Sequence, residues 1–234
     1  MVAQISLAKR ICRIAAALLL LGLTAQADID EPFGLPTVAA PDGPLSVTWR
    51  DLQSKIQSER SIIAQCRAEP DACSSPAALQ FIAIVNEGAQ YQGLTRIGRI
   101  NRAVNFAIRP INPAAPGDVG TKWTSPLTTL TAGIGDCKQY AVLKYAALSD
   151  AGIAPDDLRL VIVTIKSQRA NHVVIAVRHA AHWFILDNRT LAVVESRELP
   201  DYLPQFTLDH RGMRQFIPPS SPQVAGSPCT GVIG

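Results

Sequence analysis

The chain has 234 residues, 47% of them hydrophobic, which suits one domain with a buried core. Its formal net charge of +3 comes from residues 1–27, which hold three of the 22 basic residues and no acidic one. This leaves 19 basic against 19 acidic residues. A neutral chain lacks the basic excess of nucleic-acid-binding proteins, so we expect no nucleic-acid partner.

Residues 1–27 have the pattern of a cleaved secretory signal peptide. Lysine and arginine precede an apolar run at 14–23, and Ala-Gln-Ala at 25–27 forms a small-residue cleavage site. The run is short for a transmembrane helix, which needs about 20 apolar residues, although an uncleaved anchor is the alternative. We therefore expect export to the periplasm.

The remaining cysteines are predicted to meet an oxidising compartment, in which disulfides form. Cys66 and Cys73 bracket a turn-rich segment between two expected helices, so we expect a disulfide between them. Cys229 lies in a tail rich in Pro, Ser and Gly. Cys137 and Cys229 leave two alternatives, a second disulfide or a reduced Cys137 retained for its reactivity.

Residue patterns divide the rest of the chain into an arm, a domain and a tail. Pro and Gly at 28–46 predict an extended N-terminal arm, followed by a domain at 47–216 and a disordered tail at 217–234. Apolar spacing predicts helices first and strands later, which is an α+β order. The helices are expected at 47–66, 76–89, 94–108 and 127–131, and the strands at 158–166, 172–179, 183–186, 191–194 and 202–208.

Cys137 is expected in the first turn of one further helix. Asp136 is a suitable N-cap, apolar residues then recur at helical spacing, and Gly152 ends the pattern. A thiol at the positive end of a helix dipole favours its thiolate form, which is the nucleophile. The alternative is a small buried apolar residue.

A nucleophilic cysteine needs a base and a group that orients the base. If strands 172–179 and 183–186 are antiparallel neighbours, His172 and Asp187 face each other across the strand ends. Taken singly, His172 also fits a polar strand edge, and Asp187 fits the start of a turn. Their joint placement with Cys137 favours catalysis. Zinc is not predicted, because no second cysteine or histidine stands at ligand spacing around Cys137.

Three motifs of the chain resemble those of the bacterial transglutaminase-like cysteine proteinases, whose best-known members are the LapG-type periplasmic adhesin proteases. They are Gly135-Asp136-Cys137, Asn171-His172-Val173 and Leu186-Asp187-Asn188. Further matches occur upstream at 104–108 and 123–127, so the resemblance covers about residues 47 to 208.

The resemblance implies a papain/transglutaminase-like α+β core, in which a central helix carrying the cysteine packs on an antiparallel sheet. It implies a Cys137/His172/Asp187 triad, and it places three more residues near the oxyanion or substrate. These are Trp123, Asp136 and Asn188.

LapG-type members commonly read Gly-Asp-Cys-Glu-Asp-Tyr and depend on calcium through acidic residues around the cysteine. Here Lys138 and Gln139 follow the cysteine, so Asp136 is the only retained carboxylate. Ca²⁺ takes 6–8 oxygen ligands, which an ammonium and an amide supply poorly. We expect no metal or other cofactor at this position.

The resemblance implies an exported cysteine endopeptidase that cleaves a cell-envelope protein or surface adhesin, with an inner-membrane receptor that sequesters it. Two alternatives stay open at this point. One is a transglutaminase-like acyl transferase or amidase with the same triad, and the other is a catalytically silent peptide-binding envelope factor.

Overall fold

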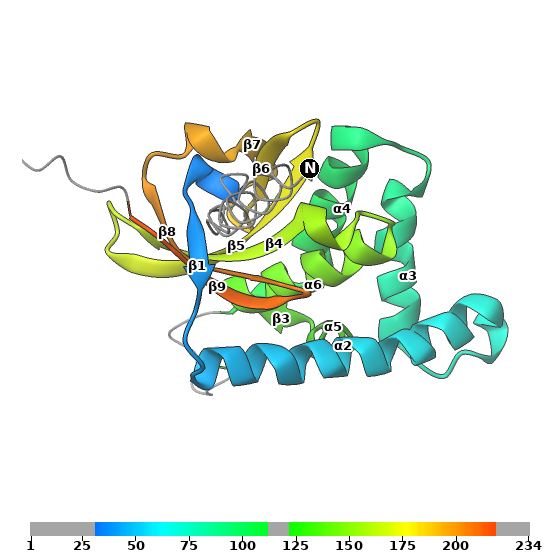
Figure 1. Cartoon of the computed structure of the whole chain (residues 1–234). Coiled ribbons are helices and arrows are strands. Elements are labelled where there is room, and N and C mark those ends of the chain that lie inside the picture. The colour runs from blue at the N-terminus through cyan, green and yellow to red at the C-terminus, as the bar shows by residue number, and fades with distance from the viewer. Residues whose placement is uncertain (1–30, 112–121, 219–234) are drawn as a thin grey trace, which may run out of the picture.

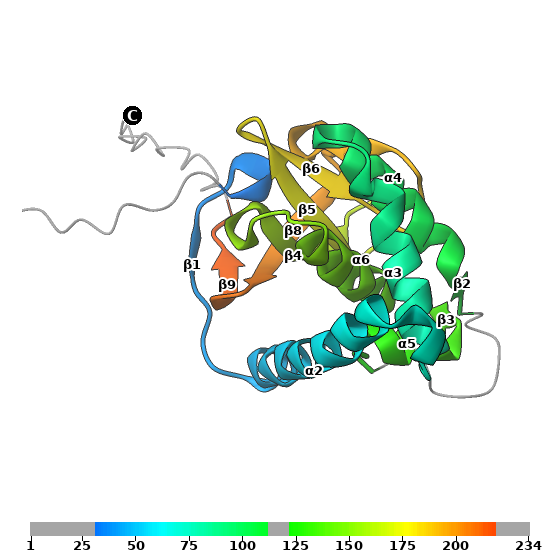
Figure 2. The ribbon, with the colours of Figure 1, turned by 90° about the vertical axis from the view of Figure 1, so that its right-hand side faces the viewer.

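A computed structural model describes residues 31–111 and 122–218. The helices gather on one side of an antiparallel sheet (Figures 1 and 2). Short 3-10 turns connect several elements, namely η1 (Pro32–Gly34), η2 (Pro70–Ala72), η3 (Pro155–Asp157) and η4 (Ser196–Glu198). The helices are α2 (Pro44–Ala68), α3 (Pro76–Ala89), α4 (Gly93–Ala107), α5 (Pro126–Ala132) and α6 (Cys137–Asp150).

The sheet has seven strands in the order β1-β9-β8-β4-β5-β6-β7, and all its neighbours pair antiparallel. A separate parallel pair joins β2 (Arg109–Pro110) to β3 (Ile134–Gly135). The predicted α+β class is confirmed. The sheet strands are β1 (Thr37–Ala39), β4 (Leu158–Ile165), β5 (Ala170–His179), β6 (His182–Leu186), β7 (Val193–Glu195), β8 (Tyr202–Asp209) and β9 (Gly212–Phe216).

Prolines and caps fix where the predicted helices begin and end. α2, α3 and α5 each begin with proline, which is favourable at the first helical position because its missing N–H needs no partner there. Ser75 caps α3 by accepting the Ala78 N–H, and Gly133 ends α5 in the left-handed region at φ 65°. All four helices predicted before Cys137 are confirmed, with ends shifted by up to three residues.

Helix α6 is the central element of the main core. All its residues from Gln139 to Leu148 are buried, which is typical of a helix enclosed on every side. It packs on β4 and β5 and is covered by α3, α4 and α5 (Figure 2). Long helix α2 adds Trp49, which meets Tyr145 of α6 edge to face at 5.4 Å.

The opposite face of the sheet has a smaller core of its own. Val161, Val174 and Trp183 belong to it, and Phe33 and Leu35 of the N-terminal segment pack against it. In the same segment, β1 pairs with β9 at the edge of the sheet. Residues 31–43, predicted to be an extended arm, thus include a 3-10 turn and a strand, and α2 begins at Pro44 rather than 47.

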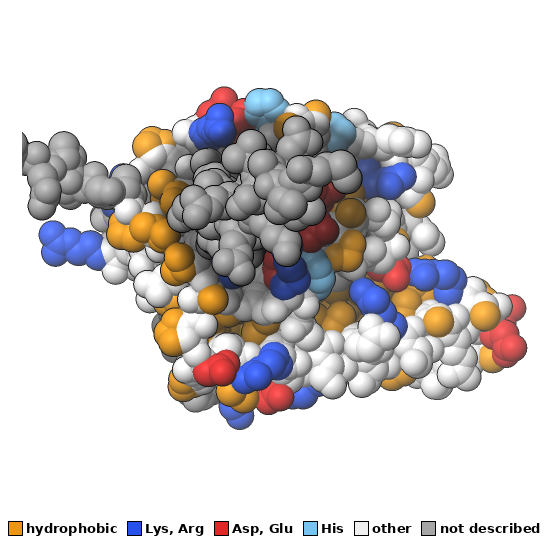
Figure 3. Space-filling view, viewed as in Figure 1, with side chains coloured by type: hydrophobic (Ala, Val, Ile, Leu, Met, Phe, Trp, Pro, Cys, Tyr) orange, Lys and Arg blue, Asp and Glu red, His pale blue; other side chains and the backbone are white. Residues whose placement is uncertain are grey.

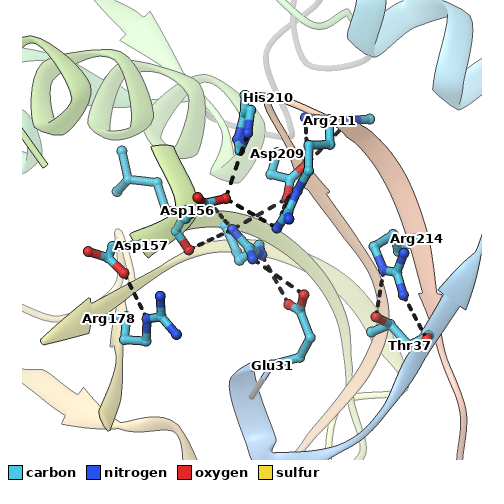
Figure 4. A network of polar contacts seen from close by, with 12 residues as sticks. Glu31, Thr37, Asp156, Asp157, Arg178, Asp209, His210, Arg211 and Arg214 are labelled. Carbon is cyan, nitrogen blue, oxygen red and sulfur yellow. Dashed lines mark hydrogen bonds and ion pairs between the residues drawn. The ribbon is translucent and has the colours of Figure 1, made fainter. Parts of the chain in front are cut away.

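A buried ionic network fastens this N-terminal segment to the sheet (Figure 4). Arg159 of β4 is the centre of the network, with Nε 3.0 Å from Glu31 Oε2 and Nη1 3.3 Å from Asp209 Oδ2. Its guanidinium also lies over the Trp183 ring at 5.2 Å. Surrounding contacts extend the network, namely Arg211–Asp156, His210–Asp156, Arg178–Asp157 and Arg214–Thr37.

The cysteines of the described residues agree with the first expectation. Cys66 and Cys73 form the predicted disulfide, which connects the end of α2 to the segment before α3. Cys137 is free. The predicted signal peptide at 1–27, Cys229 and most of the predicted tail lie outside the described residues.

Within the ranges that the structure describes, no helix is long and apolar enough to cross a membrane. The face in Figure 3 carries acidic and basic side chains interspersed, without a continuous basic tract over the described atoms. This pattern agrees with the charge balance of the sequence.

Substitution of Glu31 tests the role of the buried network. Glu31→Gln leaves the buried Arg159 with one carboxylate, so we expect the free energy of unfolding to fall by about 2 kcal/mol in urea denaturation. Asp42→Asn is the matched control, because Asp42 pairs with Arg50 on the surface at 3.6 Å and is 88% exposed. Equal effects of the two substitutions would contradict this account.

Candidate active site

Cys137 is the first residue of α6 and emerges from a tight turn. The turn runs from Gly133 through β3 to Asp136, whose side chain accepts the Lys138 N–H at 2.8 Å and caps the helix. Gly135 is required for close approach, because a Cβ there would lie 2.7 Å from Gln139 Cβ. The turn therefore fixes the position of the thiol, which is partly exposed.

Gln139 completes the cap and ties the helix start to the preceding segment. Its Oε1 accepts the Asp136 N–H at 2.9 Å, which forms a capping box. Its Nε2 donates to the Lys122 carbonyl at 2.5 Å. Trp123, next in the chain, is partly buried and packs against the main core. Both the oxygen and the nitrogen of the Gln139 amide group thus make hydrogen bonds that hold the helix start in place.

His172 and Asp187 are brought together by the hairpin of β5 and β6. The strands pair from Ile175–Leu186 to His179–His182, and Ala180 and Ala181 form the turn with φ of 50° and 65°. His172 lies near the start of β5, and Asp187 directly follows β6. His172 Nε2 is 2.9 Å from Asp187 Oδ1, and both side chains are buried, at 7% and 3% exposed.

The Cys137 thiol lies close enough to the His172 ring to raise the pKa of this imidazole. The fold therefore brings the three residues that the sequence singled out into one neighbourhood, with His172 of β5 bonded to Asp187 at the end of β6 and near Cys137 at the helix start. In such an arrangement, a proton can move from the thiol to the imidazole, and the carboxylate stabilises the charged imidazole that results.

Two residues that sequence reasoning missed hold the Asp187 carboxylate. Tyr202, the first residue of β8, donates its hydroxyl to Oδ2 at 2.6 Å. Arg189 donates its backbone N–H to Oδ1 at 2.9 Å and its Nη2 to Oδ2 at 3.0 Å. The Arg189 guanidinium also bonds the Tyr202 hydroxyl. The Asp-Asn-Arg turn in the sequence is a signal that could have identified Arg189 as a neighbour of Asp187. Tyr202 comes from a distant strand, so no local signal could have identified it.

These contacts set the pKa values of the pair. Burial by itself lowers the pKa of His172, but hydrogen bonds and charges of Asp187 and Cys137 outweigh it and raise this pKa above its usual value. Burial by itself raises the pKa of Asp187, but the His172, Tyr202 and Arg189 contacts hold it well below its usual range. The arrangement favours imidazolium beside carboxylate.

The other predicted site residues have roles that differ from one another. Asp136 caps α6, and its Oδ2 is 2.5 Å from Lys138 Nζ. Asn188 follows Asp187 and is partly buried, and its Oδ1 has no hydrogen-bond partner among the residues described. Trp123 lies in the segment that Gln139 fastens to the helix start.

Asp187→Asn tests the electrostatics of the pair. Because the pKa of Asp187 is lowered on folding, its contribution is present above its unfolded pKa of about 4 and is lost as the pH falls through the folded pKa. We expect Asp187→Asn to lower the free energy of unfolding by about 3 kcal/mol at pH 6. The difference from the unsubstituted protein should shrink below about pH 4.

Urea denaturation between pH 3 and pH 7 measures this difference, with the exposed Asp71→Asn as control. A deficit that is the same at every pH would show that Asp187 acts through packing and not through its charge.

Comparisons with known proteins identify the family of the chain. The family model of the bacterial transglutaminase-like cysteine proteinases matches residues 56–203, more than half of the chain. A search of curated protein sequences gives no match. The fold is similar to calcium-bound LapG of Legionella pneumophila, with TM-score 0.56 and 18% identity over 65% of this chain and 87% of that one.

EGTA-treated LapG of the same organism gives TM-score 0.54 and 18% identity over 67% of this chain and 84% of that one. At such identity the likeness shows the fold, and the family model supplies the assignment. The chain belongs to the bacterial transglutaminase-like cysteine proteinases and is a cysteine protease.

Proposed function

We propose that this chain is an exported endopeptidase that uses Cys137 as nucleophile, His172 as general base and acid, and Asp187 as the group that orients His172. The observation that carries the proposal is the buried His172–Asp187 hydrogen bond beside the Cys137 thiol, which acts on the pKa of His172. The cysteine protease family supports the reaction class.

In the proposed reaction, His172 takes the thiol proton and Cys137 Sγ bonds to the carbonyl carbon of the scissile peptide. The C–N bond breaks as His172 returns the proton to the leaving amine, which leaves a thioester on Cys137. His172 then takes a proton from water, the hydroxide attacks the thioester, and the C–S bond breaks to give the carboxylic acid and the Cys137 thiolate, which the proton on His172 neutralises. Asp187 stabilises imidazolium during both steps.

The oxyanion is proposed to form at the start of α6. Amides of the first helical turn point outward and lack intrahelical partners, so the Cys137 N–H is the natural first donor. Asp136 supports this donor indirectly, because its carboxylate caps the same turn. Trp123 and Asn188 are proposed to lie in the neighbourhood of the oxyanion or the substrate.

The proposed compartment is the periplasm, and the proposed substrate is a surface adhesin or another protein of the cell envelope. The signal pattern at 1–27 and the Cys66–Cys73 disulfide support export, because disulfides persist in oxidising compartments. The adhesin, and an inner-membrane receptor that sequesters the protease, are proposed on the resemblance to LapG-type proteases.

Cleavage of purified adhesin fragments tests the triad. We expect Cys137→Ala and His172→Ala each to lower the cleavage rate at least about 10³-fold, because the triad acts as one unit. His182→Ala is the matched control, since His182 lies at the hairpin tip beside Glu195 and is expected to leave the rate unchanged. Cleavage that persists in Cys137→Ala would exclude the mechanism.

The same assay separates hydrolysis from acyl transfer. A small primary amine added in excess traps a transferase product as an amide, whereas a hydrolase still releases the free acid. Mass spectrometry of the new C-terminus distinguishes the two products. An amide as the main product would replace the endopeptidase proposal with the transglutaminase alternative.

The residues at the helix start do not fit a calcium ion. The Asp136 carboxylate already receives the Lys138 amide and ammonium, and both ends of the Gln139 amide are bonded. Over the described ranges, no group of three or more Asp, Glu, His or Cys side chains is arranged to hold a metal. We propose that the Lys138 ammonium neutralises Asp136, so the protease works without calcium.

Removal of calcium tests this proposal. We expect EGTA and millimolar calcium to leave both the cleavage rate and the Tm unchanged, because a cation that does not bind the folded state cannot stabilise it. Lys138→Glu, which replaces the ammonium by a second carboxylate, is expected to make the Tm rise with calcium. Loss of cleavage by the unsubstituted protein in EGTA, restored by calcium, would overturn the proposal.

A further inference from the structure

Helices α3 and α4 lie side by side on the outside of the helical layer (Figure 2) and border an open groove of about 360 Å³. We call it the α3–α4 groove. Ligand pockets begin at about 300 Å³, so the groove is large enough to receive side chains of another molecule. Its lining includes Ile84 and Glu87 of α3 and Arg99, Arg102 and Phe106 of α4.

Phe106 offers apolar surface at this groove. It is the most exposed of the large hydrophobic side chains that the structure describes, at 66%. The guanidinium of Arg102 lies over its ring, 4.7 Å from the ring centre. Aromatic and arginine side chains are enriched among the residues that contribute most to protein–protein binding. The pair therefore presents an apolar face and a positive charge to the same neighbour.

The two arginines of the groove are available for a carboxylate. Arg99 and Arg102 are both exposed, and their guanidinium groups lie over the rings of Tyr91 and Phe106, each at 4.7 Å. Glu87 lines the same groove, but among the described residues no ion pair joins either arginine to Glu87 or to another acidic side chain. An acidic partner would thus gain ion pairs without breaking existing ones.

Positive charge is a local property of α4. The helix holds three arginines and no acidic residue, and the exposed Arg109 follows it. The chain beyond residue 27 is otherwise balanced, with 19 basic and 19 acidic residues in the whole of 28–234. Residues 219–234 contain no acidic residue, so the C-terminal tail of the chain does not complement this charge. The charge therefore favours an acidic segment of another protein.

We propose that the α3–α4 groove binds an acidic segment of a partner protein, whose carboxylates pair with Arg99 and Arg102 and whose apolar side chain packs on Phe106. These three residues follow at positions i, i+3 and i+7 on one face of α4, so they span about 10 Å of the helix. About three residues of an extended chain cover that length, so a short segment reaches all three. The groove is independent of the proposed triad, because it shares no residue with it.

Fluorescence anisotropy of a labelled peptide measures this binding. The probe has the sequence Gly-Glu-Asp-Leu-Asp-Glu-Gly, and we expect the unsubstituted protein to bind it with a Kd on the order of 10⁻⁴ M, more weakly in high salt. Two further peptides are the controls, one with Gln and Asn in place of the acidic residues and one with Ser in place of Leu. Each is expected to bind at least about fivefold more weakly.

Substitutions of opposite sign locate the peptide in the groove. We expect Arg102→Glu to weaken binding about tenfold, and Glu87→Gln to tighten it about twofold because a repelling carboxylate is lost. Lys55→Glu on the exposed face of α2 makes the same change of charge and should leave the Kd unchanged. All three side chains are exposed, so the Tm should not move. Arg99→Glu repeats the measurement if Arg102→Glu does not fold.

The acidic and the amide peptides binding equally, or Arg102→Glu and Lys55→Glu having equal effects, overturns the proposal. A dimer in light scattering that Phe106→Ser converts to a monomer also overturns it, because a second copy of the chain would then occupy the groove. Absence of cleavage by the unsubstituted protein, with peptide binding that responds to Arg102→Glu and Glu87→Gln as expected, would reject the protease proposal and support the groove.

Discussion

The buried carboxylate of Asp187 is the interaction on which the site depends. Its Oδ1 meets His172 and the Arg189 backbone, and its Oδ2 meets the Tyr202 hydroxyl and the Arg189 guanidinium. A carboxylate at 3% exposure is stable only with such donors, and they belong to β5, β8 and the loop between β6 and β7. The same contacts hold His172 in one orientation and favour its charged form.

The fold brings this carboxylate near the thiol because the helix layer packs on the sheet at the site. Cys137 comes from the start of a helix enclosed by the core, and His172 comes from a strand on which that helix packs. Because α6 is buried on all sides and β4, β5 and β6 pair over long registers, neither layer can shift without loss of packing. The Cys66–Cys73 disulfide and the Glu31–Arg159 pair secure the helical side and the far face.

Local patterns in the sequence were sufficient for most elements. The apolar spacing predicted α2 to α6, and the Ala180-Ala181 turn predicted the hairpin that sets His172 beside Asp187. The strands β1 and β9 were not predicted, because strands this short gain their stability from pairing with distant residues. Tyr202 was missed for a related reason, since only the folded chain places it near Asp187. The turn predicted at Asp187 is present, and the carboxylate of the same residue also bonds His172.

The most direct test of the central claim is the titration of the His172 imidazole, followed by NMR in the unsubstituted protein and in Asp187→Asn. The account predicts that the pKa of His172 lies above the usual value of about 6.5 and falls when the carboxylate is replaced. A pKa of His172 at or below its usual value, unchanged in Asp187→Asn, would contradict the claim that Asp187 governs the site.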